Sequence, residues 1–327
     1  MASKAEIIEM LKEDMRDEHG AIILYLQHAY FLGESGEACE IEVTARDEMR
    51  HFRWLAQAIV QLGGKPNIER TEMDIGGQTA VEWMARDVRA EEDAIAKYER
   101  HHAAIDDAKV RALIERILTD ERAHREVFAG FQAEFASAAA GGITPATVPS
   151  GQVPEKVASV VDFGTRHEYT VILQYLLHSF LTPDYEASRE FEAIAINEMQ
   201  HMGWFAEYAA EKGHAPLMAH DAVNPGPATA QMLQADLDAE KAVSAAYRQQ
   251  LQELGEEPAA GELREIIERA RDNEDWHAHM FAMMLGRVQA AEPPYGRPGL
   301  GPSQPSGEEE SPAQPGGRKF TVGSLIE

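Results

Sequence analysis

Cysteine is almost absent from the sequence, which contains one, Cys39, among 327 residues. A single thiol cannot form an intramolecular disulfide, a CxxC redox pair or a four-cysteine iron site. The sequence therefore excludes the protein classes that depend on clustered cysteines.

Aromatic residues and long apolar runs are also scarce. Phe, Trp and Tyr make up 7% of the residues, while Ala, Glu, Leu and Arg are abundant, and this composition favours helix over sheet. No stretch reaches the ~18 consecutive apolar residues of a membrane span. Residues 1–20 lack the pattern of a signal peptide. We therefore expect an all-α cytoplasmic protein without a membrane segment.

Positive charge is in short supply, since 30 Lys and Arg face 56 Asp and Glu, for a formal net charge of −26. Such an excess argues against nucleic acid and anionic membranes as partners. Two interpretations remain: a solvated acidic surface, or a field that concentrates cations near the protein. The charge count does not separate them.

Helical periodicity covers most of the first half of the chain. Apolar residues at helical spacing predict helices over residues 3–32, 37–62, 79–101 and 108–138. Connections are short except the one around residues 66–77, which is long enough to cross the end of a bundle. One long crossover is typical of ferritin-like connectivity in four-helix bundles.

The pattern then restarts, which indicates an internal duplication. Adding 150 to a residue number in the first half gives its counterpart, as in Glu18/Glu168, Tyr25/Tyr175, His28/His178, Glu48/Glu198, His51/His201 and Gly63/Gly213. The offset becomes 149 at Glu91/Glu240 and 153 at His124/His277. The predicted organisation is a first bundle (1–140), a linker (141–154), a second bundle (155–290), a tether (291–317) and a terminal peptide (318–327).

Two Glu-x-x-His motifs, Glu48–His51 and Glu121–His124, carry the chemistry of the first half. Positions i and i+3 share one helix face, so each motif directs a carboxylate and an imidazole at one spot. Single glutamates on the other two helices, Glu18 and Glu91, complete four carboxylates and two imidazoles inside a bundle. Such oxygen and nitrogen ligands suit iron or manganese. Glu92 is an alternative to Glu91, but the match to Glu240 favours Glu91.

The same order recurs in the second half with Glu168, Glu198, His201, Glu240, Glu274 and His277. Four carboxylates in a bundle core repel one another and lose hydration unless cations neutralise them. Two divalent ions per half balance four negative charges. We therefore interpret both sets as sites for a pair of metal ions.

The order Glu, Glu-x-x-His, Glu, Glu-x-x-His resembles that of the ferritin-like superfamily, in its bacterioferritin and rubrerythrin branch, over residues 3–138 and 155–290. The resemblance implies two tandem four-helix bundles, each with a di-iron (Fe²⁺/Fe³⁺) centre. The implied roles in the first half are bridging carboxylates (Glu48, Glu121), terminal carboxylates (Glu18, Glu91) and one imidazole per iron (His51, His124). The second half repeats these roles with Glu198 and Glu274, Glu168 and Glu240, and His201 and His277.

Tyr25 and Tyr175 lie two turns after the first glutamate of each half, on the same helix face. A packed core tyrosine is one interpretation. The resemblance implies the other, a catalytic tyrosine near the iron pair that can supply an electron. The repeat also pairs His28 with His178, for which the sequence suggests no role.

Three reactions share such a site: a ferroxidase that oxidises Fe²⁺ with O₂ or H₂O₂, a rubrerythrin-like peroxidase, and a manganese catalase. Rubrerythrins resemble one another in a four-cysteine iron domain and in an extra glutamate three residues after the third-helix ligand. This sequence has one cysteine, and Ala94 and Val243 at those positions. These departures favour the ferroxidase. Manganese catalase, peroxidase and a non-catalytic metal-binding protein remain alternatives.

The C-terminal region changes composition sharply, with seven Pro and six Gly in residues 291–319, which predicts disorder. An apolar end follows, and it resembles the targeting peptide by which cargo docks inside encapsulin shells: Thr321, Val322, Gly323, Ser324, Leu325 and Ile326. The resemblance implies an encapsulin shell protein as partner and an iron-storage compartment as location. The two halves could also pack together as ferritin-like subunits do, and a homodimer of the chain stays open.

Overall fold

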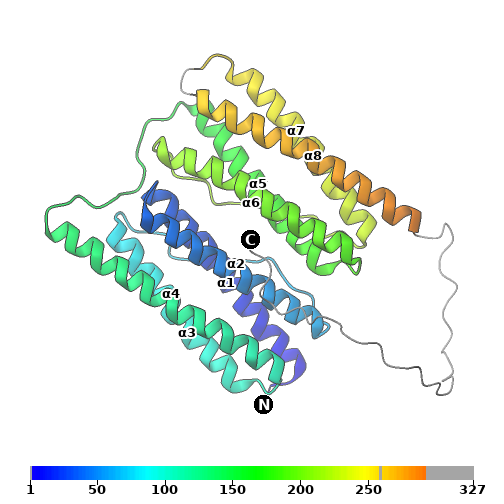
Figure 1. The fold of residues 1–327 in the computed structure, drawn as a ribbon, viewed down its shortest axis with the longest axis horizontal. Helices are drawn as coiled ribbons and strands as arrows, with labels where there is room; N and C mark the ends of the chain where they lie inside the picture. The colour runs from blue at the N-terminus through cyan, green and yellow to red at the C-terminus, as the bar shows by residue number, and fades with distance from the viewer. Residues whose placement is uncertain (1, 258–259, 292–327) are drawn as a thin grey trace, which may run out of the picture. The chain divides into compact units, whose positions relative to one another are not determined.

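The computed structural model describes residues 2–257 and 260–291, and these residues form eight helices (Figure 1). Their bounds are α1 Lys4–Leu32, α2 Gly36–Gln61, α3 Ala80–Ala104, α4 Ala108–Ala140, α5 Glu155–Leu181, α6 Tyr185–Glu211, α7 Thr229–Leu254 and α8 Gly261–Ala291. The all-α prediction is confirmed. The predicted tether and the predicted targeting peptide fall outside the described residues, apart from Ala291 at the end of α8.

Local side chains determine where the helices begin and end. Ser3 and Glu6 form a reciprocal capping box at the start of α1. The Asp107 side chain accepts hydrogen bonds from backbone N–H groups at the start of α4, and the Asp184 side chain accepts one at the start of α6. Gly33 ends α1 with a positive φ of 64°, which glycine adopts without strain. The four helices predicted in the first half are therefore present, with ends shifted by up to three residues.

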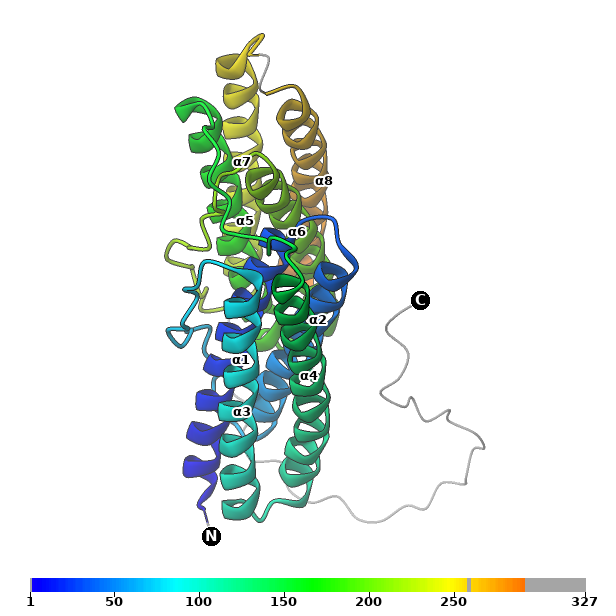
Figure 2. The ribbon, with the colours of Figure 1, turned by 90° about the vertical axis from the view of Figure 1, so that its left-hand side faces the viewer.

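Each half forms a four-helix bundle with the same internal order. In the first half α1 packs against α2, α3 against α4, and α1 against α3. The second half repeats the pairing of α5 with α6 and of α5 with α7. The long connections run from α2 to α3 and from α6 to α7, and Figure 2 shows both beside the helices. This is the connectivity with one long crossover that the sequence predicted.

Two helix segments are buried on every side, residues 22–31 of α1 and 171–179 of α5. A bundle helix normally buries one stripe, so burial all round requires neighbours on the opposite face. The bundles provide them, since α1 contacts α6 and α2 contacts α5. At this contact Tyr169 donates a 2.5 Å hydrogen bond to His19 Nε2. The two bundles therefore share one continuous apolar core.

The segment 141–154 is not helical, and backbone hydrogen bonds attach it to both bundles. Ala80 N–H donates to the Ala146 carbonyl at 3.0 Å, and Gly151 N–H donates to the Gly213 carbonyl at 2.8 Å. No described helix combines the length and apolarity needed to cross a bilayer.

Two helical glycines give a matched test of this packing. A Cβ at Gly164 on α5 would lie 2.8 Å from ring carbons of Phe205 on α6, whereas a Cβ at Gly130 on α4 would meet nothing within 4 Å. Gly164→Ala should lower the free energy of unfolding by about 1–3 kcal/mol through overpacking. Gly130→Ala should raise it by about 0.5–1 kcal/mol through higher helix propensity. Denaturant titration measures both changes, and equal shifts would contradict this account of the α5–α6 contact.

Candidate metal centres

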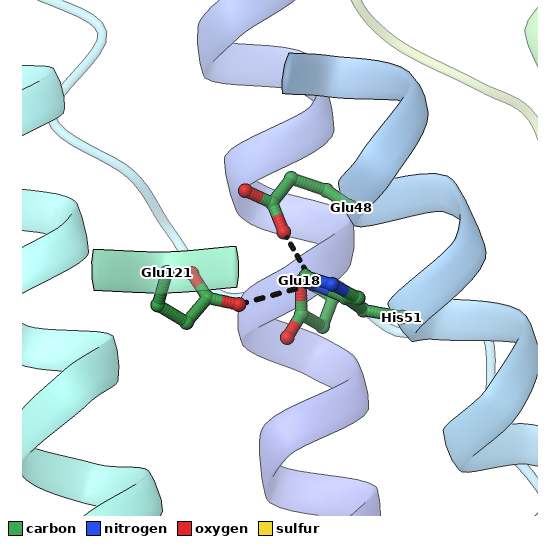
Figure 3. Close-up of side chains that lie close together, drawn as sticks. All are labelled: Glu18, Glu48, His51 and Glu121. Atoms are coloured by element: carbon green, nitrogen blue, oxygen red, sulfur yellow. Dashed lines mark hydrogen bonds and ion pairs between the residues drawn. The ribbon is translucent and has the colours of Figure 1, made fainter. Parts of the chain in front are cut away.

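The structure brings all six predicted ligands of the first half together. They form two overlapping groups whose ligand atoms lie within 4.8 Å of one another: Glu18, Glu48, His51 and Glu121, and Glu48, Glu91, Glu121 and His124. Figure 3 shows the first group converging from α1, α2 and α4. Glu48 and Glu121 belong to both groups, so their carboxylates lie where bridging ligands of two ions would lie.

The distances between these atoms fit a common ion. His51 Nδ1 lies 2.8 Å from Glu48 Oε2 and 3.0 Å from Glu121 Oε1. His124 Nδ1 lies 2.9 Å from Glu48 Oε1. Neighbouring ligands about 2.1 Å from an octahedral ion are themselves about 3 Å apart. The cluster therefore has the spacing of a ligand shell.

The second half reproduces the arrangement. Its overlapping groups are Glu168, Glu198, His201 and Glu274, and Glu198, Glu240, Glu274 and His277. His201 Nδ1 lies 2.7 Å from Glu198 Oε2, and His277 Nδ1 lies 2.8 Å from Glu198 Oε1. Here Glu198 and Glu274 occupy the shared positions.

Unpartnered buried atoms show that these residues fit metal ions. All twelve side chains belong to residues no more than 6% exposed. Glu48 Oε1 and His124 Nδ1 are buried and close, yet they are not aligned for a hydrogen bond with each other or with another group. Both Glu198 oxygens and His201 Nδ1 are in the same situation. Buried polar atoms without partners are costly, and coordination to a cation would satisfy them.

Burial and mutual repulsion raise the pKa of several cluster carboxyls. The pKa of Glu91 lies well above its usual value because the group is buried and faces Glu121 and Glu48. The pKa values of Glu168 and Glu240 rise well above the usual value for the same reasons. These carboxyls therefore need either protons or cations beside them.

The histidines respond in the complementary direction. Burial alone would lower the pKa of His201, but the carboxylates of Glu198 and Glu274 raise it to about 11. The same balance raises the pKa of His277 to about 9. In the protein without metal the imidazoles therefore hold protons that a bound cation would displace.

The predicted tyrosines contact the clusters. Tyr25 donates a 2.6 Å hydrogen bond to Glu91 Oε1, and Tyr175 donates one of the same length to Glu240 Oε1. Aromatic rings on the fourth helix of each bundle, Phe128 and Phe281, pack against them at centroid distances of 4.7 and 5.1 Å. Each tyrosine therefore holds the third-helix glutamate of its cluster in place.

A second pair of tyrosines, which the sequence did not assign to the sites, hydrogen-bonds the first-helix glutamates of the clusters. Tyr98 donates to Glu18 Oε1, and Tyr247 donates to Glu168 Oε1. Their spacing could have indicated a place near the clusters, because each tyrosine lies two helical turns after a third-helix glutamate and the two match in the repeat.

The repeat-matched histidines His28 and His178 lie one turn beyond the site tyrosines and pair with buried aspartates. His28 Nδ1 donates to Asp87 at 2.8 Å, and His178 Nδ1 lies 2.8 Å from Asp236. All four side chains are fully buried. These pairs therefore form a polar layer next to each cluster. Glu92, the alternative to Glu91, instead pairs with Arg125 at the surface.

A pocket of about 370 Å³ reaches the first cluster between α1 and α3. Its inner wall includes Glu18, Tyr25, Tyr98 and Glu121. Acidic residues dominate the charged lining: Asp14, Asp17, Glu72, Asp74 and Asp93, against Arg86, Arg89 and Lys97. The pocket therefore offers small molecules and cations a route to this cluster.

Duplicated bundles with carboxylate–histidine clusters define a ferritin-like protein, and sequence comparison agrees. The profile of the ferritin-like domain matches twice, over residues 8–136 and 165–291. The chain therefore belongs to the ferritin-like family and carries its domain in tandem.

The chain is similar in sequence to two bacterioferritins. The chain is 32% identical to the bacterioferritin of Desulfovibrio desulfuricans over 127 residues, 37% of this chain and 71% of that protein. It is 32% identical to the bacterioferritin of Streptomyces coelicolor over 130 residues, 38% of this chain and 78% of that protein. Among solved structures, the D. desulfuricans bacterioferritin, studied with its di-iron site in different catalytic states, has 26% identity and a TM-score of 0.40, covering 46% of this chain and 94% of its own.

The pKa shifts predict how pH changes the stability of protein stripped of metal. Glu91, Glu168 and Glu240 keep protons in the folded state that the unfolded chain releases above pH ~4.5, and His201 and His277 do so above pH ~6.5. Stability should therefore fall as pH rises from 5 to 8. With saturating Co²⁺ the fall should disappear, because cations replace those protons. Denaturant midpoints at several pH values, with chelator or Co²⁺, measure this; identical pH profiles would contradict it.

Proposed function

We propose that the chain is a di-iron ferroxidase that oxidises Fe²⁺ to Fe³⁺ with O₂ or H₂O₂. The main support is that each bundle holds four buried carboxylates and two imidazoles, in overlapping groups that share two glutamates. The similarity to bacterioferritins supports the same class of reaction. The alternatives are peroxidase or manganese catalase chemistry and non-catalytic metal binding.

The ligand set supports iron. Carboxylate oxygens and imidazole nitrogens suit Fe²⁺ and Mn²⁺, and the lone Cys39 is exposed, away from the buried clusters. The four carboxylates of each cluster would balance the charge of two divalent ions. Two Fe²⁺ ions held together would supply the two electrons that reduce O₂ and two protons to H₂O₂, so that a one-electron product need not form.

The chain's own residues have separate tasks in this reaction. Glu48 and Glu121, with their counterparts Glu198 and Glu274, would hold both ions of a pair. Tyr25 and Tyr175 fix the terminal carboxylates through their hydroxyl groups, and each lies where it can supply an electron or a proton. The acidic pocket between α1 and α3 favours Fe²⁺ as an entering substrate over an anion.

The first measurement is O₂ consumption after Fe²⁺ is added, followed by stopped-flow absorbance. Glu48→Ala and Glu198→Ala together should abolish rapid O₂ consumption, because each removes a carboxylate shared by two ligand groups. Glu92→Ala, at a surface ion pair, is the control and should leave it unchanged. Binding of Fe²⁺ without O₂ consumption would instead identify a metal-binding protein, and rapid H₂O₂ dismutation by the manganese form would identify a catalase.

We further propose that the protein is the cargo of an encapsulin shell in the cytoplasm and acts in iron storage and protection from oxidative stress. The supporting feature is the terminal sequence TVGSLI at residues 321–326, which follows a Pro- and Gly-rich stretch. Val322, Leu325 and Ile326 would occupy apolar grooves of a partner, and Gly323 would allow close approach of the backbone. A shell would also provide the volume in which Fe³⁺ accumulates.

Deleting residues 318–327 should abolish co-purification with a co-expressed encapsulin shell. Because the deletion lies outside both bundles, Fe²⁺ oxidation by the free protein should be unchanged. A control chain with residues 321–326 in scrambled order should behave like the deletion. Encapsulation of the truncated chain at the full-length level would refute the targeting role.

A further inference from the structure

The four site histidines differ in what their outer nitrogens contact. In the first bundle, His51 Nε2 lies 3.2 Å from Asp120 Oδ2, and His124 Nε2 lies 3.4 Å from Asp47 Oδ2. In the second bundle both partners are amides: His277 Nε2 lies 2.8 Å from Asn197 Oδ1, and His201 Nε2 lies 2.9 Å from Asn273 Nδ2.

These partners are equivalent positions in the duplication. Asp47 and Asn197 each precede the second-helix ligand glutamate and differ by 150 in number, 197 − 47. Asp120 and Asn273 each precede the fourth-helix glutamate and differ by 153, 273 − 120. Carboxylate has thus been replaced by amide, or the reverse, at both histidines of one centre together.

The replacement changes which imidazole nitrogen is free to bind metal. A carboxylate only accepts hydrogen bonds, so with a cation bound Asp47 and Asp120 would hold the imidazole proton on Nε2 and leave Nδ1 as the ligand atom. An asparagine amide rotates to accept or to donate, so it accommodates either tautomer. In the second bundle a neutral imidazole can therefore carry its single proton on Nδ1, facing a glutamate, and still keep its outer hydrogen bond, which would stabilise the empty centre.

The charges around the two centres also favour tighter metal binding by the first bundle. A carboxylate partner makes the imidazole a stronger donor to a cation than an amide partner does. Arg50 and Arg116 pair with Asp47 and Asp120 and hold them in place. At the equivalent positions the second bundle has Gln200, and Arg269, whose guanidinium lies over the Trp204 ring 5.0 Å from its centroid. The four side chains sum to zero charge in the first bundle and to +1 in the second.

We infer that the two centres are unequal: the first bundle holds its divalent ions tightly, and the second binds them more weakly and exchanges them. This inference rests on the proposed function only in assuming that both clusters bind divalent metal. It assigns to Asp47 and Asp120 a positioning role that Asn197 and Asn273 do not reproduce. Outer-shell partners of this kind change metal affinity by about 10- to 100-fold.

Anaerobic Co²⁺ titration of the full chain, followed by visible absorbance and calorimetry, tests the inequality without any turnover. Glu198→Ala leaves only the first centre intact, and Glu48→Ala leaves only the second. The Kd of the Glu198→Ala chain should be lower by about 10-fold or more. Equal Kd values would overturn the inference, as would tighter binding by the second centre.

Reciprocal exchange identifies the cause. In the Glu198→Ala chain, Asp47→Asn with Asp120→Asn should weaken Co²⁺ binding about 10-fold or more. In the Glu48→Ala chain, Asn197→Asp with Asn273→Asp should strengthen it. These substitutions preserve side-chain shape, and thermal melting of the metal-free proteins checks that each variant folds. If both exchanges leave Kd unchanged, the outer partners do not set the difference and the inference is wrong.

The ferroxidase proposal and the inequality of the two centres can be refuted independently. A chain that binds Co²⁺ unequally at its two centres but does not consume O₂ with Fe²⁺ would refute the ferroxidase and support the inequality. A chain that consumes O₂ with Fe²⁺ but binds Co²⁺ equally at its two centres would support the ferroxidase and refute the inequality. Failure of both single-centre chains to bind Co²⁺, when both are folded, would refute both.

Discussion

Four carboxylates forced together away from water in each bundle are the constraint on which the surrounding structure depends. Such a cluster opposes folding, because it loses hydration and its charges repel. The opposing contribution comes from burial of apolar side chains along the shared core, including segments of α1 and α5 that are enclosed on every side. Proton or metal binding then removes the repulsion. The packing between the bundles therefore stabilises a geometry that the ligands alone would not hold.

The layers beside each cluster limit how far the carboxylates can relax. Tyr25 on α1 donates a hydrogen bond to Glu91 on α3, and Tyr98 on α3 donates one to Glu18 on α1. Phe128 packs against the Tyr25 ring. The buried His28–Asp87 pair lies in the next layer along the same two helices. A glutamate with a fixed hydroxyl partner keeps one oxygen engaged and presents the other to the cluster. This arrangement makes the ligand geometry a property of the fold before any ion binds.

Sequence spacing predicted the eight residues of the four Glu-x-x-His motifs because each motif lies within one helix, where the relation of i to i+3 is fixed. The four single glutamates were predicted from their order along the chain and from the match between the two halves. The helices were predictable from apolar periodicity and capping residues such as Ser3 and Gly33. The partners of the histidine outer nitrogens were not predictable, because Asp47 reaches a histidine on another helix, and that contact depends on how the helices are rotated. Spacing placed Tyr98 on the helix face of Glu91, but its contact with Glu18 joins two helices, so its partner could not be predicted. The targeting role of residues 321–326 is a prediction from the sequence motif.

Duplication within one chain permits a difference that identical subunits cannot have. In a symmetric dimer every equivalent position carries the same residue, so both sites and both sides of the contact must be alike. Here His19 and Tyr169, equivalent under the offset of 150, contact each other, and one donates while the other accepts. Asp47 and Asn197 are likewise equivalent but chemically different. Joining the bundles in one chain thus lets the interface become complementary and lets each centre have its own outer partners, while the ligand set stays the same in both.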